Sequence, residues 1–188
     1  TPNPESLKFV TNKMLYAGTA DFRTRELADE YSPLAAALFD LPYVKSVYIC
    51  NNFVTLTKEI NYAWEDLMIR TKDFIKNYVA EEKPVILDGF AEAMTAAEDK
   101  RMSEINYSED DGEMVKRIRE LIDTYVKPAV EMDGGNIEFK SYHDGVVTLI
   151  MQGACSGCPS STVTLKSGIE AMLKRMIPQV KEVVQEMA

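Results

Sequence analysis

Two cysteines, Cys155 and Cys158, stand three positions apart in the segment GACSGCP at residues 153–159. The glycines on either side of Cys155 allow tight backbone turns, and the proline suits the first position of a helix. The positive end of such a helix stabilises a thiolate, so the pattern predicts a lowered pKa for Cys158. The spacing therefore predicts two chemically active thiols at a strand-to-helix turn.

Four interpretations of this pair compete. Two buried cysteines can pack as small hydrophobic side chains, but glycines surround the pair and we expect a strand-to-helix turn to expose it. A thioredoxin-like dithiol also opens a helix, yet no aromatic residue stands beside Cys155 and the domain starts with a helix instead of a strand. A structural zinc site needs four ligands within one fold. Outside the pair the chain has one further cysteine, Cys50, in the other domain, and one histidine, His143, so zinc would need two chains.

The fourth interpretation is an iron–sulfur cluster, which usually needs four thiolates. One chain supplies two, so a symmetric dimer would supply four, with the cluster on the two-fold axis. A site divided in this way can come apart, which suits a carrier that builds a cluster and passes it on. We therefore expect a carrier, with no catalytic nucleophile–base pair and no conventional enzyme activity.

Composition narrows the remaining function classes. The 188 residues are 46% hydrophobic and 27% charged, which is ordinary for a globular protein. A formal net charge of −9 does not suit a nucleic-acid partner, and no apolar run is long enough to span a bilayer. Three cysteines do not form a disulfide framework, and residues 1–4 carry no secretory or transit signal. We expect the bacterial cytoplasm, or the mitochondrial matrix if a transit peptide has been removed.

The distribution of charge predicts two domains. Residues 88–111 hold eight acidic and two basic residues and few branched apolar ones, as a solvated linker would, with some helix at residues 91–97. The predicted parts are residues 1–87, the linker 88–111 and residues 112–188. Both domains are expected to be small and α+β, each with a short, mainly antiparallel sheet packed against helices.

Within these domains, local patterns predict the elements that position the cysteines. In the first domain they are strands at 7–10, 44–50 and 53–57, with a hairpin turn at Asn51 and Asn52 between the last two. A helix capped by Ser32, with Pro33 at its first position, and a helix at 64–79 are also predicted. In the second they are a helix that stops near Pro128, paired strands at 137–142 and 146–151, a helix after the cysteines, and a strand at 180–184.

Cys50 and His143 are weaker candidates for metal ligands. Cys50 ends a predicted strand with no nearby partner, which indicates an incidental packed thiol. His143 precedes Asp144 and Gly145 between two predicted strands, which indicates a turn residue. Residues 133–136 (DGGN) lack the lysine and spacing of a phosphate-binding loop, and we interpret them as a tight turn that shapes the face of the cluster site.

Several stretches resemble a known family. The second domain, with MDGGNIEF at 132–139, GACSGCPSS at 153–161 and TLKSGIE at 164–170, closely resembles the NifU C-terminal-like domain of Nfu proteins. The first domain, with TPNPESLKF at 1–9 and VKSV at 44–47, is similar to the N-terminal domain of the two-domain Nfu proteins. The resemblance covers nearly the whole chain outside the acidic linker.

This resemblance implies an iron–sulfur cluster scaffold or carrier. It implies that Cys155 and Cys158 bind a [4Fe–4S] cluster between two protomers, with [2Fe–2S] as the alternative, and deliver it to apo-proteins. The expected partners are apo iron–sulfur proteins, upstream assembly proteins and a second copy of the chain. A thiol–disulfide oxidoreductase is the alternative function, and client docking by the first domain is a further hypothesis.

Overall fold

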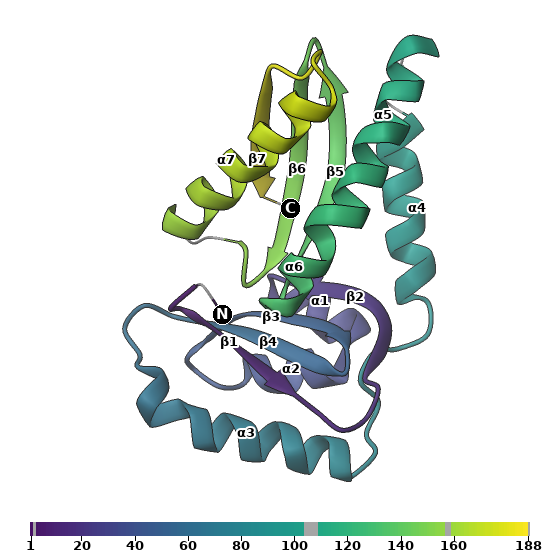
Figure 1. Ribbon diagram of the computed structural model, residues 1–188. Coiled ribbons are helices and arrows are strands. Elements are labelled where there is room, and N and C mark those ends of the chain that lie inside the picture. Colours follow the sequence, from purple (N-terminus) through teal and green to yellow (C-terminus); the bar gives the residue numbers. More distant parts are fainter. Residues whose placement is uncertain (2, 104–108, 157–158, 188) are drawn as a thin grey trace. The chain divides into compact units, whose positions relative to one another are not determined.

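The computed structural model describes residues 1, 3–103, 109–156 and 159–187, in two compact units (Figure 1). The first unit comprises Thr1 and Asn3–Ala96, and the second begins at Ala97. The division falls inside helix α4 (Phe90–Ser103), which extends the short helix predicted at residues 91–97 in both directions. The predicted limits of the linker at residues 88 and 111 stay a prediction.

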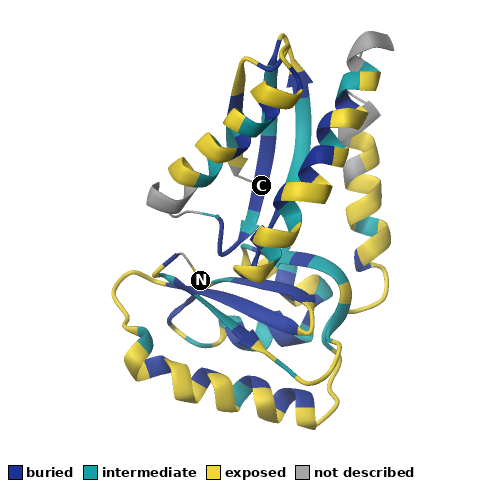
Figure 2. Cartoon of the chain, viewed as in Figure 1, coloured by how far each residue is buried: buried dark blue, intermediate teal, exposed yellow. Residues whose placement is uncertain are grey.

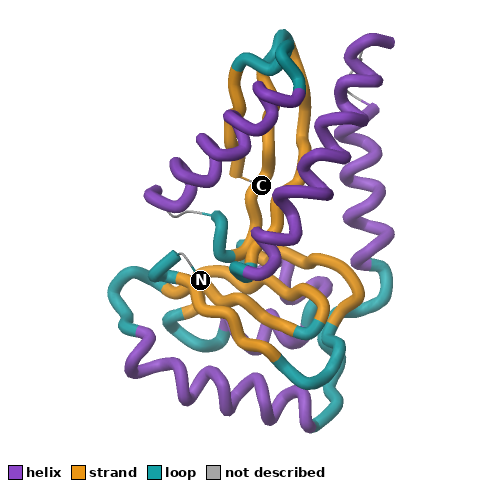
Figure 3. Tube along the Cα trace, viewed as in Figure 1, coloured by secondary structure: helices purple, strands orange, loops and turns teal. Residues whose placement is uncertain are grey.

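The first unit is a four-stranded antiparallel sheet in the order β1-β4-β3-β2. Its elements are β1 (Ser6–Val10), β2 (Tyr16–Phe22), α1 (Arg25–Tyr31), α2 (Pro33–Phe39), β3 (Val44–Asn51), β4 (Phe53–Lys58) and α3 (Trp64–Ala80). The buried residues of the three helices share one hydrophobic core with alternate strand residues, and Phe90 joins this core. Helices therefore cover one face of the sheet, and Figure 3 shows the strands and helices as separate layers.

Two local signals in this unit act as the sequence predicts. The hydroxyl of Ser32 accepts the backbone N–H of Ala35 at 3.0 Å and caps α2, with Pro33 in the first turn. Asn51 adopts a φ of 47° in the turn that pairs Cys50 with Phe53. Strand β2 and helix α1 were not predicted. The β2 sequence lacks alternating branched residues. The strand forms by pairing with β3, and this pairing contains an irregularity.

The second unit is a mixed three-stranded sheet in the order β5-β6-β7. Strands β5 (Gly135–His143) and β6 (Val146–Gly153) are antiparallel, and Asp144 and Gly145 form the turn between them with φ values of 49° and 88°. Strand β7 (Glu182–Met187) pairs parallel to β6, which requires a crossover, and helix α7 (Pro159–Met176) provides it. The α+β prediction is confirmed for both units, with one parallel pair in the second.

The helix before β5 corrects a prediction. It does not stop near Pro128 but runs as α5 (Glu109–Leu121), a π turn η1 (Ile122–Val126) and α6 (Lys127–Met132). The N–H of Lys127 donates to the carbonyl of Ile122, five residues back, directly before the proline. Because proline has no N–H and its ring crowds the preceding turn, we infer that the wider π turn accommodates it without ending the helix.

Side chains of α5, η1, α6 and α7 form the core of this unit with one face of its sheet. Figure 2 shows the contrast between buried strand residues and exposed outer helix faces. Within the described ranges, no helix is long and apolar enough to cross a membrane.

Candidate functional site

Cys155 lies in a tight turn at the end of β6. The strand ends at Gly153, whose φ of 62° turns the chain. The N–H of Ala154 donates to the carbonyl of Gly134 at 3.2 Å, and the N–H of Ser156 donates to the carbonyl of Gly153 at 3.1 Å. Backbone bonds therefore fix the turn to the segment that connects α6 with β5.

Gly135 provides the space that the thiol occupies. It is paired with Gly153 at the start of the β5–β6 ladder. A Cβ atom on Gly135 would lie 2.8 Å from Sγ of Cys155 and 2.8 Å from the carbonyl oxygen of Gln152. Since real Cβ atoms do not approach so closely, only glycine allows Cys155 to take this position.

Asn136 supports the same end of the ladder. Its fully buried side chain donates from Nδ2 to Glu138 at 3.0 Å and to Gln152 at 2.8 Å. Its Oδ1 is buried and has no hydrogen-bond partner among the described residues. The bridge ties β5 to β6 one residue pair away from Gly135, so it holds the strand that carries Cys155. The sequence predicted a turn at residues 133–136, but Gly135 and Asn136 belong to β5. The contact of Asn136 with Gln152 joins residues sixteen positions apart, so no local pattern could show it.

The environment of Cys155 favours the neutral thiol. The side chain is a free cysteine, 7% exposed, in the core of the second unit, so the exposure expected from the sequence is wrong for Cys155. Burial, with a smaller effect of the Asp133 charge, raises the pKa of the Cys155 thiol to about 11. In the metal-free chain Cys155 is therefore protonated at neutral pH, and a metal that binds it must displace the proton.

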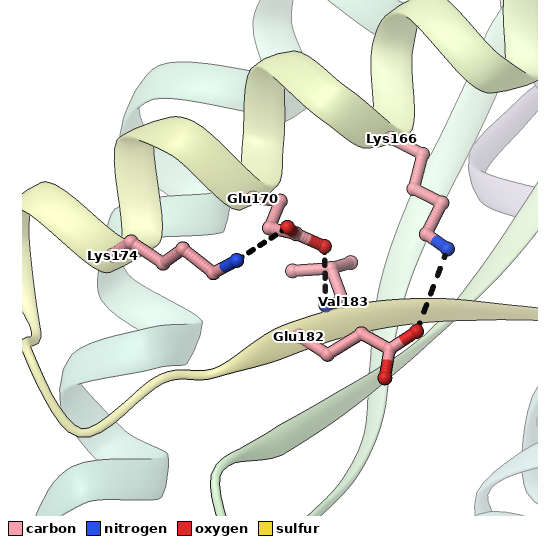
Figure 4. A network of polar contacts seen from close by, with 5 residues as sticks. All are labelled: Lys166, Glu170, Lys174, Glu182 and Val183. Atoms are coloured by element: carbon pink, nitrogen blue, oxygen red, sulfur yellow. Dashed lines mark hydrogen bonds and ion pairs between the residues drawn. The ribbon is translucent and has the colours of Figure 1, made fainter.

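Helix α7, which follows the cysteine pair, is fastened to β7 by a polar network (Figure 4). Glu170 accepts the N–H of Val183 through one oxygen at 3.0 Å and contacts Nζ of Lys174 through the other at 2.5 Å. The Lys174 hydrogen bond, followed by that of Val183, lowers the pKa of Glu170. The helix is thus held to the edge strand by a carboxylate that stays ionised.

The other predicted site residues lie as follows. Cys158 lies outside the described residues. Cys50 belongs to the first unit, where it is buried beside Tyr48 and Phe53, so it is far along the chain from Cys155 and packed in another sheet. His143 is exposed at the end of β5, next to the turn at Asp144. Over the described part of the chain, no three His, Cys, Asp or Glu side chains lie together as metal ligands would.

Two family models match the chain. Residues 1–82 match the N-terminal domain of the scaffold protein Nfu/NifU, and residues 118–184 match the NifU-like domain. The second match contains β5, β6 and Cys155, and the first contains the whole four-stranded sheet.

Whole proteins of the same organisation are also similar. The mitochondrial NifU-like proteins 5 and 4 of Arabidopsis thaliana are 43% and 42% identical over 99% of this chain, which spans 66% and 64% of their lengths. The human mitochondrial NFU1 iron–sulfur cluster scaffold homolog is 40% identical over 100% of this chain and 70% of its own length. From its two domain matches and these relatives, the chain belongs to the Nfu family.

Proposed function

We propose that the chain is an iron–sulfur cluster scaffold and carrier. Cys155 and Cys158 of one chain, with the same pair of a second chain, bind a [4Fe–4S] cluster, which is then transferred to apo-proteins. The cluster is the cargo of the protein, and the protein performs no catalysis of its own. The human relative is named as an iron–sulfur cluster scaffold homolog, which supports the assembly role.

The observation that carries this proposal is the position of Cys155. It is a free thiol fixed by Gly135 and by backbone bonds at the exit of β6. Cys158 follows three residues later, so each chain offers half of the four thiolates that such clusters usually need. A site built from two equal halves on a two-fold axis explains why the Nfu chain supplies only one pair.

Transfer is then a ligand exchange without a change of oxidation state. The iron–sulfur bonds to the carrier cysteines break as bonds to client cysteines form. The carrier thiolates regain protons, and the client thiols give up the same number. The carrier contributes the fixed turn at Cys155 and the α7 helix that follows the cysteine pair.

The thiol–disulfide oxidoreductase remains the alternative. An attacking cysteine in that class has a lowered pKa, because the thiolate is the nucleophile. The pKa of Cys155 is instead raised to about 11 by burial. We therefore expect no catalysis of insulin reduction by a thiol donor, and a rate above the uncatalysed one would favour the alternative.

The relatives support a proposed location, and the proposed carrier role implies the partners. The Arabidopsis and human proteins are named mitochondrial, and we propose the mitochondrial matrix over the bacterial cytoplasm for this chain. Apo iron–sulfur proteins and upstream assembly proteins are the proposed partners, and a second copy of the chain binds only with the cluster.

Anaerobic reconstitution with iron and sulfide tests this function. We expect a brown protein with about four irons per two chains, and about none after Cys155→Ala or Cys158→Ala. Cys50→Ala is the matched control, because it removes a buried cysteine from the other unit, and it should keep the full iron content. Iron binding that survives both substitutions, or that is lost with Cys50→Ala, would contradict the assignment of the ligands.

A further inference from the structure

The outer strand of the first sheet has one side that pairs with no other strand among the described residues. Strand β1 is at the edge of the sheet, and in the described part of the chain its one strand partner is β4. The bonds from Lys58 to Glu5 and from Thr11 to Asn52 place the backbone groups of odd-numbered residues toward β4. Even-numbered residues therefore direct theirs outward. The N–H of Ser6 donates to the carbonyl of Asn3, and the carbonyl of Ser6 accepts the hydroxyl of Thr1. The backbone groups of Val10 face the open edge, and its side chain is 65% exposed.

A groove of about 790 Å³ runs between this edge and helix α3. Leu7 and Phe9 from β1, with Ile75 and Val79 from α3, give it apolar walls. Met68 also lines it and is 46% exposed. An exposed strand edge beside an apolar groove is the arrangement to which extended peptides bind by strand addition.

The charged residues that line the groove are all basic. Four lysines line it and no acidic residue does, although the whole chain carries a net charge of −9. Lys13 is paired with Glu82 at 2.9 Å. Lys72 and Lys76, one helical turn apart on α3, are exposed and form no ion pair within the described residues. The groove is thus complementary to a negatively charged ligand.

We propose that this groove binds an extended acidic segment of a partner protein. The segment pairs its backbone with β1 at Val10, places alternate apolar side chains between β1 and α3, and directs carboxylates to Lys72 and Lys76. This inference goes beyond cluster binding, because it assigns partner recognition to the first unit. It does not depend on whether the second unit holds a cluster.

The test uses the full-length, metal-free chain and a fluorescein-labelled octapeptide that alternates glutamate with valine. Fluorescence anisotropy should show saturable binding that weakens as salt is added. A peptide that alternates lysine with valine should not bind. Stronger or equal binding of the lysine peptide, or of a labelled dodecathymidine strand as a plain polyanion, would overturn the proposal.

Two variants separate the charge from the strand pairing. Lys72→Glu with Lys76→Glu should weaken the affinity for the acidic peptide by about tenfold or more. The matched control is Lys45→Glu with Arg70→Glu, which makes the same charge change in the same unit on residues that do not line the groove. Equal losses in both double variants would show that only net charge matters and would contradict the groove.

Val10→Pro removes the outward N–H without removing a bond to β4, and proline is tolerated at such edge positions. It should abolish binding while Val10→Thr keeps it, with unchanged circular dichroism in both. Unchanged affinity in Val10→Pro would exclude strand addition. All these variants should reconstitute the cluster as the natural chain does, so a failure of the groove and a failure of the cluster site would be distinguishable.

Discussion

The two units differ in how they use a sheet covered by helices on one face. The first has four antiparallel strands, a large core and an open, lysine-lined edge. The second has three strands, and its distinctive feature is a buried thiol held at the end of β6 by the close approach of Gly135. Binding a cluster requires fixed geometry at one turn, whereas recognising a partner requires an exposed edge. This difference fits the two proposals made above, cluster binding in the second unit and partner recognition in the first.

The largest expected effects come from matched core substitutions. Leu38 on α2 and Leu173 on α7 are both fully buried, one in each unit. Each change to alanine should lower the free energy of unfolding of its own unit by about 2–5 kcal/mol. Only Leu173→Ala should lower the cluster content, because α7 follows the cysteine pair.

The fluorescence of the single tryptophan reports the unfolding of the first unit and so distinguishes Leu38→Ala from Leu173→Ala. Trp64 belongs to the first unit, where its ring packs edge-on against Phe9 at 6.0 Å. In a denaturant titration followed by tryptophan fluorescence, Leu38→Ala should shift the transition and Leu173→Ala should not. An equal shift in both variants would show that the units unfold together.

Gly135→Ala should damage the cluster site most specifically. Its new methyl group would overlap Sγ of Cys155, so we expect a loss of about 1–3 kcal/mol in stability and a large loss of cluster. Two glycines serve as controls. At Gly145 the φ is 88°, and an added Cβ atom would lie 2.7 Å from the carbonyl oxygen of Gln179. Gly145→Ala should therefore destabilise the second unit but leave the iron content of the folded protein unchanged.

Gly168 on α7 has open space around it, so Gly168→Ala should be neutral or stabilising by up to about 1 kcal/mol. Denaturant unfolding and iron analysis of the three variants provide the comparison. A Gly135→Ala protein with full iron content would contradict the role given to this close approach.

The smallest expected effect is pH-dependent. The pKa of Glu170 is lowered by Lys174 and Val183, so the folded state favours the ionised carboxylate. Its stabilising contribution is therefore present above about pH 4.5 and is lost as the pH falls through the lowered folded value. Glu170→Gln should reduce the stability of the second unit at pH 7, and the reduction should be smaller at pH 3, as thermal unfolding would show.

Glu120→Gln is the control for this charge. Glu120 is an exposed residue of α5 and has no ion pair among the described residues. It should have little effect at either pH. A Glu170→Gln protein that is equally destabilised at pH 3 would show that packing, and not the charge, explains the loss.

The sequence predicted the features that depend on neighbouring residues. The Ser32 cap, the Asn51 turn and the Asp144–Gly145 turn all form where local chemistry placed them. It did not predict β2, which forms because β3 offers it a partner, and it ended a helix at Pro128 that a π turn carries onward. The close approach of Gly135 to Cys155 joins the first residue of β5 to the turn after β6, twenty residues away in the chain, so no local pattern could show it.

The central claim is that two chains share one cluster. Native mass spectrometry of the anaerobically reconstituted protein tests this most directly, because it weighs the chains, the iron and the sulfide in a single species. We predict two chains with about four irons and four sulfides, and a single chain once the cluster is removed by a chelator. A species with one chain and a complete cluster would contradict the shared site. A metal-free dimer as abundant as the cluster-bound dimer would also contradict it.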